Sequence, residues 1–320
     1  AVALQMIQPP PDHVLESMLR YLIACHDSLR IKKSLHGEYT YVPFSDNVFV
    51  LNCQTSDSCE DNSCDRIIGQ LIEQVDLKSG RLLKASLYHK PQEVVLYIVI
   101  HHVAVDGVSW NILLMDLQRL LKQWNKGEVF SLIHNGSSYQ SWALSQRTIK
   151  KIVSDTNSLI PTEKCIFETK VLDELITKRV FNDVVFPNHA KPIELLLTAF
   201  CMTVRSLGDR INEDIQIEYE RHGRSLEEAF SNEIQTVGWF TQICRLTSSI
   251  EFADSNSNLR TYFRKIKALY EASEQFGDFT GGWNPTAARL NFLGDIRTDY
   301  NDFHLIPLYS FERVSCLMEV

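Results

Sequence analysis

Residues Ile100–Trp110 read IHHVAVDGVSW, and this stretch decides how the rest of the chain is interpreted. Two adjacent histidines end a run of β-forming residues, VVLYIVI. An Asp-Gly pair then signals a turn, and apolar residues recur at helical spacing over Val108–Trp124, with Gly127 beyond the end. The sequence therefore predicts a buried strand, a turn and a helix in immediate succession.

The two histidines are expected to have different roles. Side chains of successive strand residues point to opposite faces, so one histidine can pack while its neighbour faces a cavity. We expect His101 on the buried face and His102 toward the cavity. Asp106 and Gly107 are expected to be structural, with Asp106 pinning the loop beneath His102. Amides at the start of the helix from Val108 are candidates for stabilising a developing negative charge.

Composition excludes several classes of protein. The chain has 320 residues, enough for two domains, and a net charge of −8 at pH 7, which argues against nucleic acid as a partner. No apolar run is long enough to span a bilayer, and no charged-then-apolar leader opens the chain, so we expect a cytoplasmic protein and no membrane. Cys53, Cys59 and Cys64 fit no common zinc spacing, so we expect no metal site, and Cys201 and Cys244 are expected in the core.

Helices and strands are interleaved along the chain, which indicates a mixed α/β (α+β) class. A change to polar, Gly/Ser-containing sequence divides it into an N-terminal lobe, 1–145, and a C-terminal lobe, 146–320. Further helices are expected at 12–23, 67–75, 139–152, 171–178, 192–207, 225–230 and 260–270. Extended segments are expected at 27–33, 39–42, 82–88, 94–101, 164–169, 215–220, 236–241 and 288–292, with a bend at Gly238.

Three further motifs lie in the C-terminal part. They read EYERHGRS at 218–225, TVGWFT at 236–241 and RLNFLGD at 289–295. By composition alone, EYERHGRS favours a charged turn before a helix, and TVGWFT reads as an apolar strand with a bend at glycine. RLNFLGD fits an ordinary strand that ends at glycine as well as it fits a functional motif. Their order along the chain after HHVAVDG indicates that the motifs belong together.

With these motifs, the chain resembles the condensation-domain superfamily of nonribosomal peptide synthetases. HHVAVDG fits the HHxxxDG motif of the superfamily, and the longer HHVAVDGVSWNILLMDL resembles its epimerization branch. The ERHGR segment is similar to the EGHGRE pattern, VGWFT to an epimerization-type sequence, and LNFLGD to FNYLGQ. Weaker matches are CHDSLR at 25–30 and SYQSWA at 138–143. The resemblance extends from about Ala3 to Phe303.

The resemblance implies two chloramphenicol-acetyltransferase-like lobes in a V, with the active site in the cleft. It implies L-to-D epimerization at the α-carbon of an aminoacyl or peptidyl thioester. The substrate would be carried on the 4'-phosphopantetheine of a peptidyl carrier domain, beside neighbouring synthetase domains, and no intrinsic cofactor is required. His102 and Glu220 are then the catalytic acid–base residues. Trp110, Asn291 and Trp239 are candidates for oxyanion or substrate contacts.

Departures from the family pattern leave alternatives open. Arg221 stands where glycine is usual, Ser225 where glutamate is usual, and Phe292 where tyrosine is usual. Glu218 could raise the pKa of Glu220 by like-charge repulsion, and Arg221 and Arg224 could oppose that effect. The alternatives are a condensation domain that forms a peptide bond between carrier-bound substrates, or a degenerate carrier-docking domain without catalysis.

Overall fold

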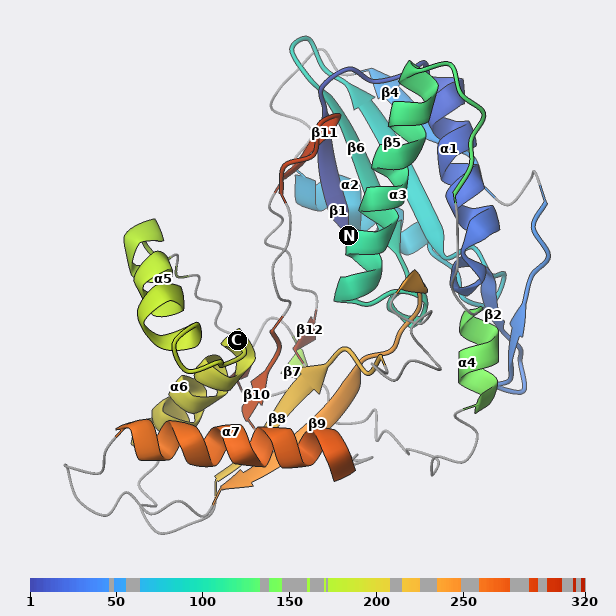
Figure 1. Cartoon of the computed structure of the whole chain (residues 1–320). Helices are drawn as coiled ribbons and strands as arrows, with labels where there is room; N and C mark the ends of the chain where they lie inside the picture. Colours follow the sequence, from blue (N-terminus) through green and yellow to red (C-terminus); the bar gives the residue numbers. More distant parts are fainter. Residues whose placement is uncertain are drawn as a thin grey trace. The chain divides into compact units, whose positions relative to one another are not determined.

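The computed structural model forms two compact units (Figure 1). Unit 1 comprises Ala1–Lys150, His222–Thr241 and Leu293–Ser310; unit 2 comprises Lys151–Arg221, Gln242–Phe292 and Phe311–Val320. The structure describes residues 1–45, 49–55, 64–132, 138–145, 160–161, 170, 172–207, 215–224, 235–248, 259–276, 288–292, 298–306, 313–314 and 318–319.

The units differ from the two lobes expected from sequence. The first break falls at Lys150, close to the expected 145, but two later segments return to unit 1. The residues His222–Thr241, which carry the HGR and VGWFT motifs, group with HHVAVDG rather than with the rest of the C-terminal half. A change in composition can mark one boundary along the chain. It cannot show that later segments pack with the first unit again.

Unit 1 is built on a five-stranded sheet. Neighbouring strands are antiparallel except β4 and β5, which are parallel. The order across the sheet is β11 (Phe303–Ile306), β1 (Val2–Met6), β6 (Val94–Ile100), β5 (Leu83–His89) and β4 (Asn52–Thr55). The expected strands at 82–88 and 94–101 are confirmed as β5 and β6, whereas β1, β4 and β11 were not predicted.

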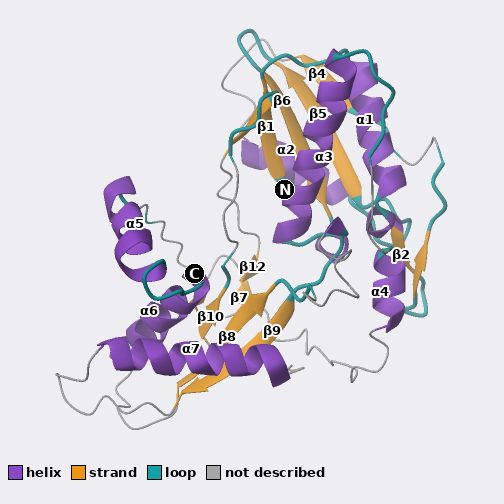
Figure 2. Cartoon of the chain, viewed as in Figure 1, coloured by secondary structure: helices purple, strands orange, loops and turns teal. Residues whose placement is uncertain are grey.

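Both faces of β6 are covered, which explains its uninterrupted apolar sequence. Leu96, Ile98 and Ile100 belong to the core beneath α1 (Asp12–Cys25) and α3 (Gly107–Asn125). The alternate residues Val95, Tyr97 and Val99 belong to the core beneath α2 (Cys64–Gln74). Figures 1 and 2 show α1 and α3 on one face of the sheet and α2 on the other. A strand buried on both faces has no polar positions to alternate with apolar ones.

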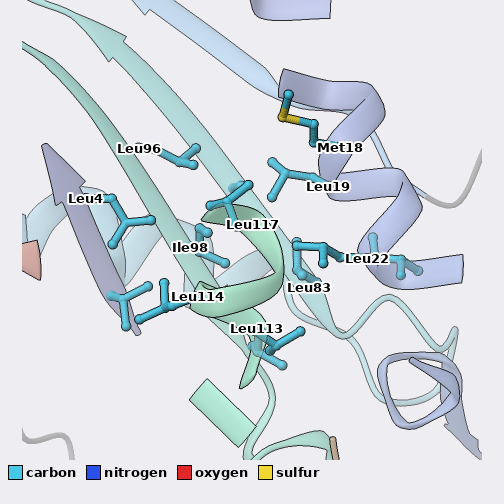
Figure 3. Packing of buried hydrophobic residues seen from close by; sticks show 14 of the residues in the cluster. Leu4, Met18, Leu19, Leu22, Leu83, Leu96, Ile98, Leu113, Leu114 and Leu117 are labelled. Carbon is cyan, nitrogen blue, oxygen red and sulfur yellow. The ribbon is translucent and has the colours of Figure 1, made fainter. Parts of the chain in front are cut away.

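The helices α1 and α3 pack as their apolar periodicity predicts. The buried residues of α1 are the six that the sequence spacing selects: Val14, Leu15, Met18, Leu19, Leu22 and Ile23. Figure 3 shows Leu19 and Leu22 of α1 with Leu113, Leu114 and Leu117 of α3 over the strand residues. Each such leucine contributes about 1.5–3 kcal/mol by leaving water. Gly127, beyond the end of α3, has a φ of 69°, as a helix-ending glycine requires.

Smaller elements complete unit 1. They are a 3₁₀ turn η1 (Asp27–Arg30), a hairpin of β2 (Ile31–Lys33) with β3 (Tyr39–Tyr41), and the helix α4 (Tyr139–Ser145). The expectation of an extended chain from residue 27 is thus wrong for its first four residues. There Arg30 donates hydrogen bonds to the C-terminal carbonyls of α1, among them Ala24 O at 2.8 Å. This contact holds the turn against the end of the helix.

Unit 2 has a four-stranded sheet in the order β13 (Met318–Glu319), β10 (Ala288–Leu290), β8 (Ile215–Arg221), β9 (Gln242–Ser248). Its core lies between this sheet, α6 (Pro192–Leu207) and α7 (Leu259–Phe276), and includes the expected Cys201 and Cys244. Helix α5 (Glu174–Val180) continues into a π-helical turn, η6 (Phe181–Val185). A two-stranded pair joins β7 (Ile160–Pro161) to β12 (Arg313–Val314). The mixed α/β class is confirmed.

Two expected elements and part of a third lie outside the described residues, and a further expected strand is wrong. The segments 164–169 and 225–230 are not among the described residues, and neither is the part of the 139–152 helix beyond 145. The expected strand at 236–241 is a loop with a bend at Gly238, and the strand β9 begins only at Gln242.

Candidate functional site

The turn after β6 places the two histidines differently, although not by strand alternation. The strand ends at Ile100, and His102 begins a 3₁₀ turn, η2 (His102–Ala104). The ring of His101 is half-buried, and its Nδ1 accepts a hydrogen bond of 3.1 Å from the Val103 amide. The side chain of His102 is exposed. The expected separation of the pair is therefore present, but a turn produces it.

His101 is held in its neutral form. Burial and the neighbouring His102 lower the pKa of His101 below its usual value of 6.5. Since Nδ1 accepts from the Val103 amide, the single ring proton is on Nε2. The ring therefore acts as a fixed acceptor that closes the turn.

We expect His101 to make unit 1 sensitive to acid. The pKa of His101 is lower in the folded state than its unfolded value near 6.5. The contribution of His101 to folding stability is therefore complete above pH 6.5. It is lost as the pH falls through the lower pKa of the folded state. His101→Asn keeps an acceptor near Nδ1 without the titration. Urea unfolding at pH 8 and pH 5 should show a smaller loss of unfolding free energy for this variant than for the native chain. Equal losses in both proteins would contradict this role.

Asp106 is a buried N-cap with several donors around it. Its Oδ1 accepts from the Ser109 amide and from the Ser109 hydroxyl, both at 2.8 Å. Its Oδ2 accepts from the Phe240 amide at 3.1 Å. The guanidinium of Arg224 binds both oxygens, with Nη1 at 2.6 Å and Nη2 at 3.0 Å. As predicted, Asp106 fixes the loop that follows His102, and its partners come from distant segments.

Ser109 and Arg224 extend this network to the VGWFT loop. The Ser109 Oγ accepts from the Gly238 amide at 3.0 Å and lies 2.8 Å from the Gly238 carbonyl oxygen. Arg224 Nη2 donates to the Thr236 carbonyl at 3.2 Å, and the guanidinium lies over the Phe240 ring, 4.2 Å from its centroid. The segments that carry VDGVS, HGR and VGWFT thereby form one buried network within unit 1.

Gly223 allows the backbone turn in the HGR segment. Gly223 has a φ of 56°, a left-handed conformation that side chains disfavour. The Arg224 amide donates to His222 Nδ1 at 3.2 Å, closing a turn like the one at His101. This turn directs the Arg224 side chain to Asp106.

Trp239 lies beside His102. The ring centroids are 5.5 Å apart with an interplanar angle of 67°, an edge-to-face contact, and the indole is 45% exposed. Trp110, the other tryptophan proposed as a contact, is partly buried and packs against the core of unit 1. Gly107 is exposed as the first residue of α3. Of the candidates in unit 1, only Trp239 contacts the histidine in the described structure.

The sequence reasoning missed the roles of Ser109 and Arg224. Ser109 lies in the VSW part of the motif, and Arg224 was considered only for its effect on Glu220. At the start of α3 the Ser109 amide serves Asp106 Oδ1 and the Trp110 amide donates to the Asp106 carbonyl at 3.1 Å. These two amides are committed to the cap, which removes them as oxyanion donors.

The remaining candidates, Glu220 and Asn291, are in unit 2. Glu220 is on β8, half-buried, and Asn291 directly follows β10. The two strands run parallel with Leu290 opposite Tyr219, so both candidates lie at the carboxyl end of this pair. The structure thus describes His102 and Glu220 within separate units.

Glu218, two residues before Glu220 on β8, forms a buried ion pair. Glu218 accepts a 2.7 Å hydrogen bond from Arg289 Nη2, and both side chains are almost wholly buried. The guanidinium of Arg221 lies over the Tyr270 ring, 6.0 Å from its centroid. The sequence left open whether the charge of Glu218 acts on Glu220 or is opposed by Arg221 and Arg224. In the structure, Arg289 balances it.

Glu218→Gln should weaken unit 2 without changing its shape. The amide can still accept from Arg289, but the buried guanidinium loses its counter-charge, at a cost of about 1–3 kcal/mol. Urea unfolding measures the loss. The control is Glu174→Gln on the exposed face of α5, where the ion pair to Lys178 is solvated and the expected change is within about 0.5 kcal/mol. Equal changes in the two variants would contradict the pairing.

Two kinds of feature are absent from the described residues. Within the described ranges, no group of three or more His, Cys, Asp or Glu side chains could hold a metal ion. None of the described helices is long and apolar enough to cross a membrane.

Comparison with known proteins agrees with this geometry. Residues 8–154 match the Condensation domain family. The chain is 28% identical over 331 aligned residues to surfactin synthase subunit 2 of Bacillus subtilis, covering 91% of this chain and 9% of that protein. It is 25% identical over 259 aligned residues to bacitracin synthase 3 of Bacillus licheniformis, covering 72% of this chain and 4% of that protein. The chain thus spans less than a tenth of either relative's length.

Solved structures share the fold. The epimerization domain from the third module of tyrocidine synthetase B superposes with a TM-score of 0.76 at 20% identity, covering 98% of this chain and 80% of that one. VibH, a condensation enzyme of nonribosomal peptide synthesis, gives a TM-score of 0.68 at 13% identity, covering 95% and 77%. The expected chloramphenicol-acetyltransferase-like fold class is confirmed. Residues 8–154 are thus similar to the Condensation domain family, and the chain shares the fold of condensation and epimerization domains of nonribosomal peptide synthesis.

Proposed function

We propose that this chain is an epimerization domain. It converts the α-carbon of an aminoacyl or peptidyl thioester from L to D while the substrate is held on the 4'-phosphopantetheine of a carrier domain. One observation carries the proposal above all others. Trp239, from the VGWFT motif that resembles the epimerization branch, lies against His102 of the superfamily motif. The higher TM-score with an epimerization domain than with VibH supports the same reading.

The proposed chemistry is proton exchange. A thioester acidifies the α-proton, and inversion requires the proton to leave one face and another to arrive on the opposite face. We assign these two tasks to His102 and Glu220. Imidazole in general accepts and returns protons near neutral pH, which suits one of the tasks. A carboxyl group suits the other when it can take up a proton.

The proposed setting is a cytoplasmic synthetase. The substrate arrives on a peptidyl carrier domain, and neighbouring synthetase domains load it and take the product. The long multidomain relatives support this setting, since the chain matches a small part of each. Proton exchange requires no metal or organic cofactor of the chain itself.

Two other activities are open to a member of this superfamily. A condensation domain would join two carrier-bound substrates through an amide bond. A degenerate domain would bind a carrier without catalysis, and Arg221 and Phe292, where the resemblance expects glycine and tyrosine, motivate that reading. Each activity gives a different result in the following assay.

The test uses the whole chain with a carrier domain loaded with an L-aminoacyl-pantetheine. The reaction runs in deuterated water, and the released amino acid is analysed for deuterium and for configuration. An epimerase gives α-deuteration together with a D/L mixture. Absence of both, with carrier binding intact, overturns the proposal in favour of docking. A second loaded carrier in a parallel reaction detects amide formation, which would indicate condensation.

A further inference from the structure

The loop that carries Trp239 is held from two sides. On one side, the amides of Gly238 and Phe240 donate to Ser109 and Asp106, as described above. On the other side lies Tyr139, the first residue of α4. Both sides belong to unit 1, and the Tyr139 side remains without an assigned role.

Tyr139 contacts each residue of the loop in turn. Its hydroxyl donates a hydrogen bond of 2.9 Å to the Trp239 carbonyl oxygen. A β-carbon at Gly238 would lie within 2.8 Å of three carbons of the Tyr139 ring, so the ring occupies the space that only glycine leaves. The ring also meets Phe240 edge to face, with centroids 5.3 Å apart. The indole of Trp239 is thus held through its own backbone.

Tyr139 is itself fixed. The amides of Tyr139 and Gln140 donate to the two carboxylate oxygens of Asp27, each at 3.1 Å, which caps α4. Trp142 stacks on Tyr139 at 5.3 Å and lies 4.4 Å from Phe240. Burial, with a contribution from Asp106, raises the pKa of Tyr139 to about 12, so the phenol keeps its proton and remains a donor. The hydrogen bonds to Asp27 join the CHDSLR segment to the SYQSWA segment, the two segments with the weaker family matches.

We propose that Tyr139 is a positioning residue for His102, acting through Trp239. The Tyr139 hydroxyl and ring fix the backbone of residues 238–240, and this backbone sets the indole edge-to-face against the imidazole. Loss of the hydroxyl lets the loop relax, so His102 samples other orientations while the rest of unit 1 is unchanged. As a role in catalysis, the inference rests on the proposed function.

The first test is Tyr139→Phe, which removes the hydroxyl and keeps the ring. The expected result is a fall in kcat for α-proton exchange of about 2- to 10-fold, with KM within about twofold, the size expected for one hydrogen bond. The NMR chemical shifts of the His102 ring protons should also change, because the Trp239 ring lies against them. Tyr88→Phe is the control, because Tyr88 packs on the α2 side of the sheet. Unchanged kcat and unchanged His102 chemical shifts in Tyr139→Phe would overturn the inference.

A double-variant cycle tests the steric part without any activity. Gly238→Ala should lower the thermal midpoint of the otherwise native chain, because the new methyl group meets the Tyr139 ring. In a Tyr139→Leu background, the same change should cost much less. Equal losses in both backgrounds would contradict the contact. If Tyr139→Phe changes the NMR chemical shifts of the His102 ring while the native chain shows no α-proton exchange, the positioning role holds and the epimerase is rejected. The two failures are therefore distinguishable.

Discussion

His102→Ala is expected to lower the rate of L-to-D conversion by about 10²- to 10⁴-fold, the usual contribution of one positioned acid–base group. The His102 side chain is exposed at the first residue of the η2 turn, so its removal leaves the network around Asp106 in place. The measurement is the initial rate of α-deuteration and inversion on a loaded carrier domain, with the thermal midpoint recorded alongside.

Two further variants sharpen this prediction. Glu220→Gln should suppress inversion as strongly as His102→Ala. If each group serves one face, the residual exchange of the two variants should favour opposite enantiomers, because each keeps a different group. His36→Ala, at an exposed site in the turn between β2 and β3, is the matched control and should be unchanged. Full activity of His102→Ala would remove the residue from the mechanism.

Arg224→Met is expected to lower the free energy of unfolding of unit 1 by about 3–5 kcal/mol. The change leaves the Asp106 carboxylate buried without its bidentate partner, and it removes the bond to the Thr236 carbonyl. The methionine also lacks the guanidinium that lies over the Phe240 ring, so loss of this cation–π contact adds to the cost. Urea unfolding followed by tryptophan fluorescence gives the loss.

Two controls separate this ion pair from arginine pairing in general. Arg119→Met removes an arginine that also contacts a buried carboxylate, Asp116, but Arg119 is itself more than half exposed, so the expected cost is below about 1 kcal/mol. The double variant Asp106→Leu with Arg224→Met should recover part of the loss, since no buried charge remains unpaired. A cost for Arg224→Met no larger than that for Arg119→Met would contradict the network.

The elements that could be predicted are those in which local pattern and burial agree. Helix α1 buries the residues that its 3.6-residue period selects, and α6 (Pro192–Leu207) has the predicted bounds. The prediction of a strand at VGWFT was wrong because the amides of these β-forming residues do not bond within a sheet. The amides of Gly238 and Phe240 bond to Ser109 and Asp106, more than a hundred positions away. Propensity carries no information about partners so distant.

The same limit applies to the candidate site. The role of Asp106 could be predicted because its contacts with Ser109 lie within a short turn–helix segment. The structure shows the His102 side chain exposed, and its place in a catalytic cleft stays a prediction. Arg224 could not be assigned, since its partner Asp106 lies 118 positions away. The sequence left open how the charge of Glu218 is balanced, and the structure pairs it with Arg289 on the neighbouring strand. Pairing between strands decides this balance, and one strand read alone does not show it.

The central place of β6 has a consequence for how unit 1 opens. Its backbone is bonded to β1 on one side and β5 on the other, and both faces are covered. We therefore expect its amides to exchange with solvent mainly through unfolding of the whole unit, whereas edge elements open at lower free energy. The turn that carries His102 begins where this central strand ends. Local openings elsewhere in unit 1 can thus occur without loosening the anchor of the histidine.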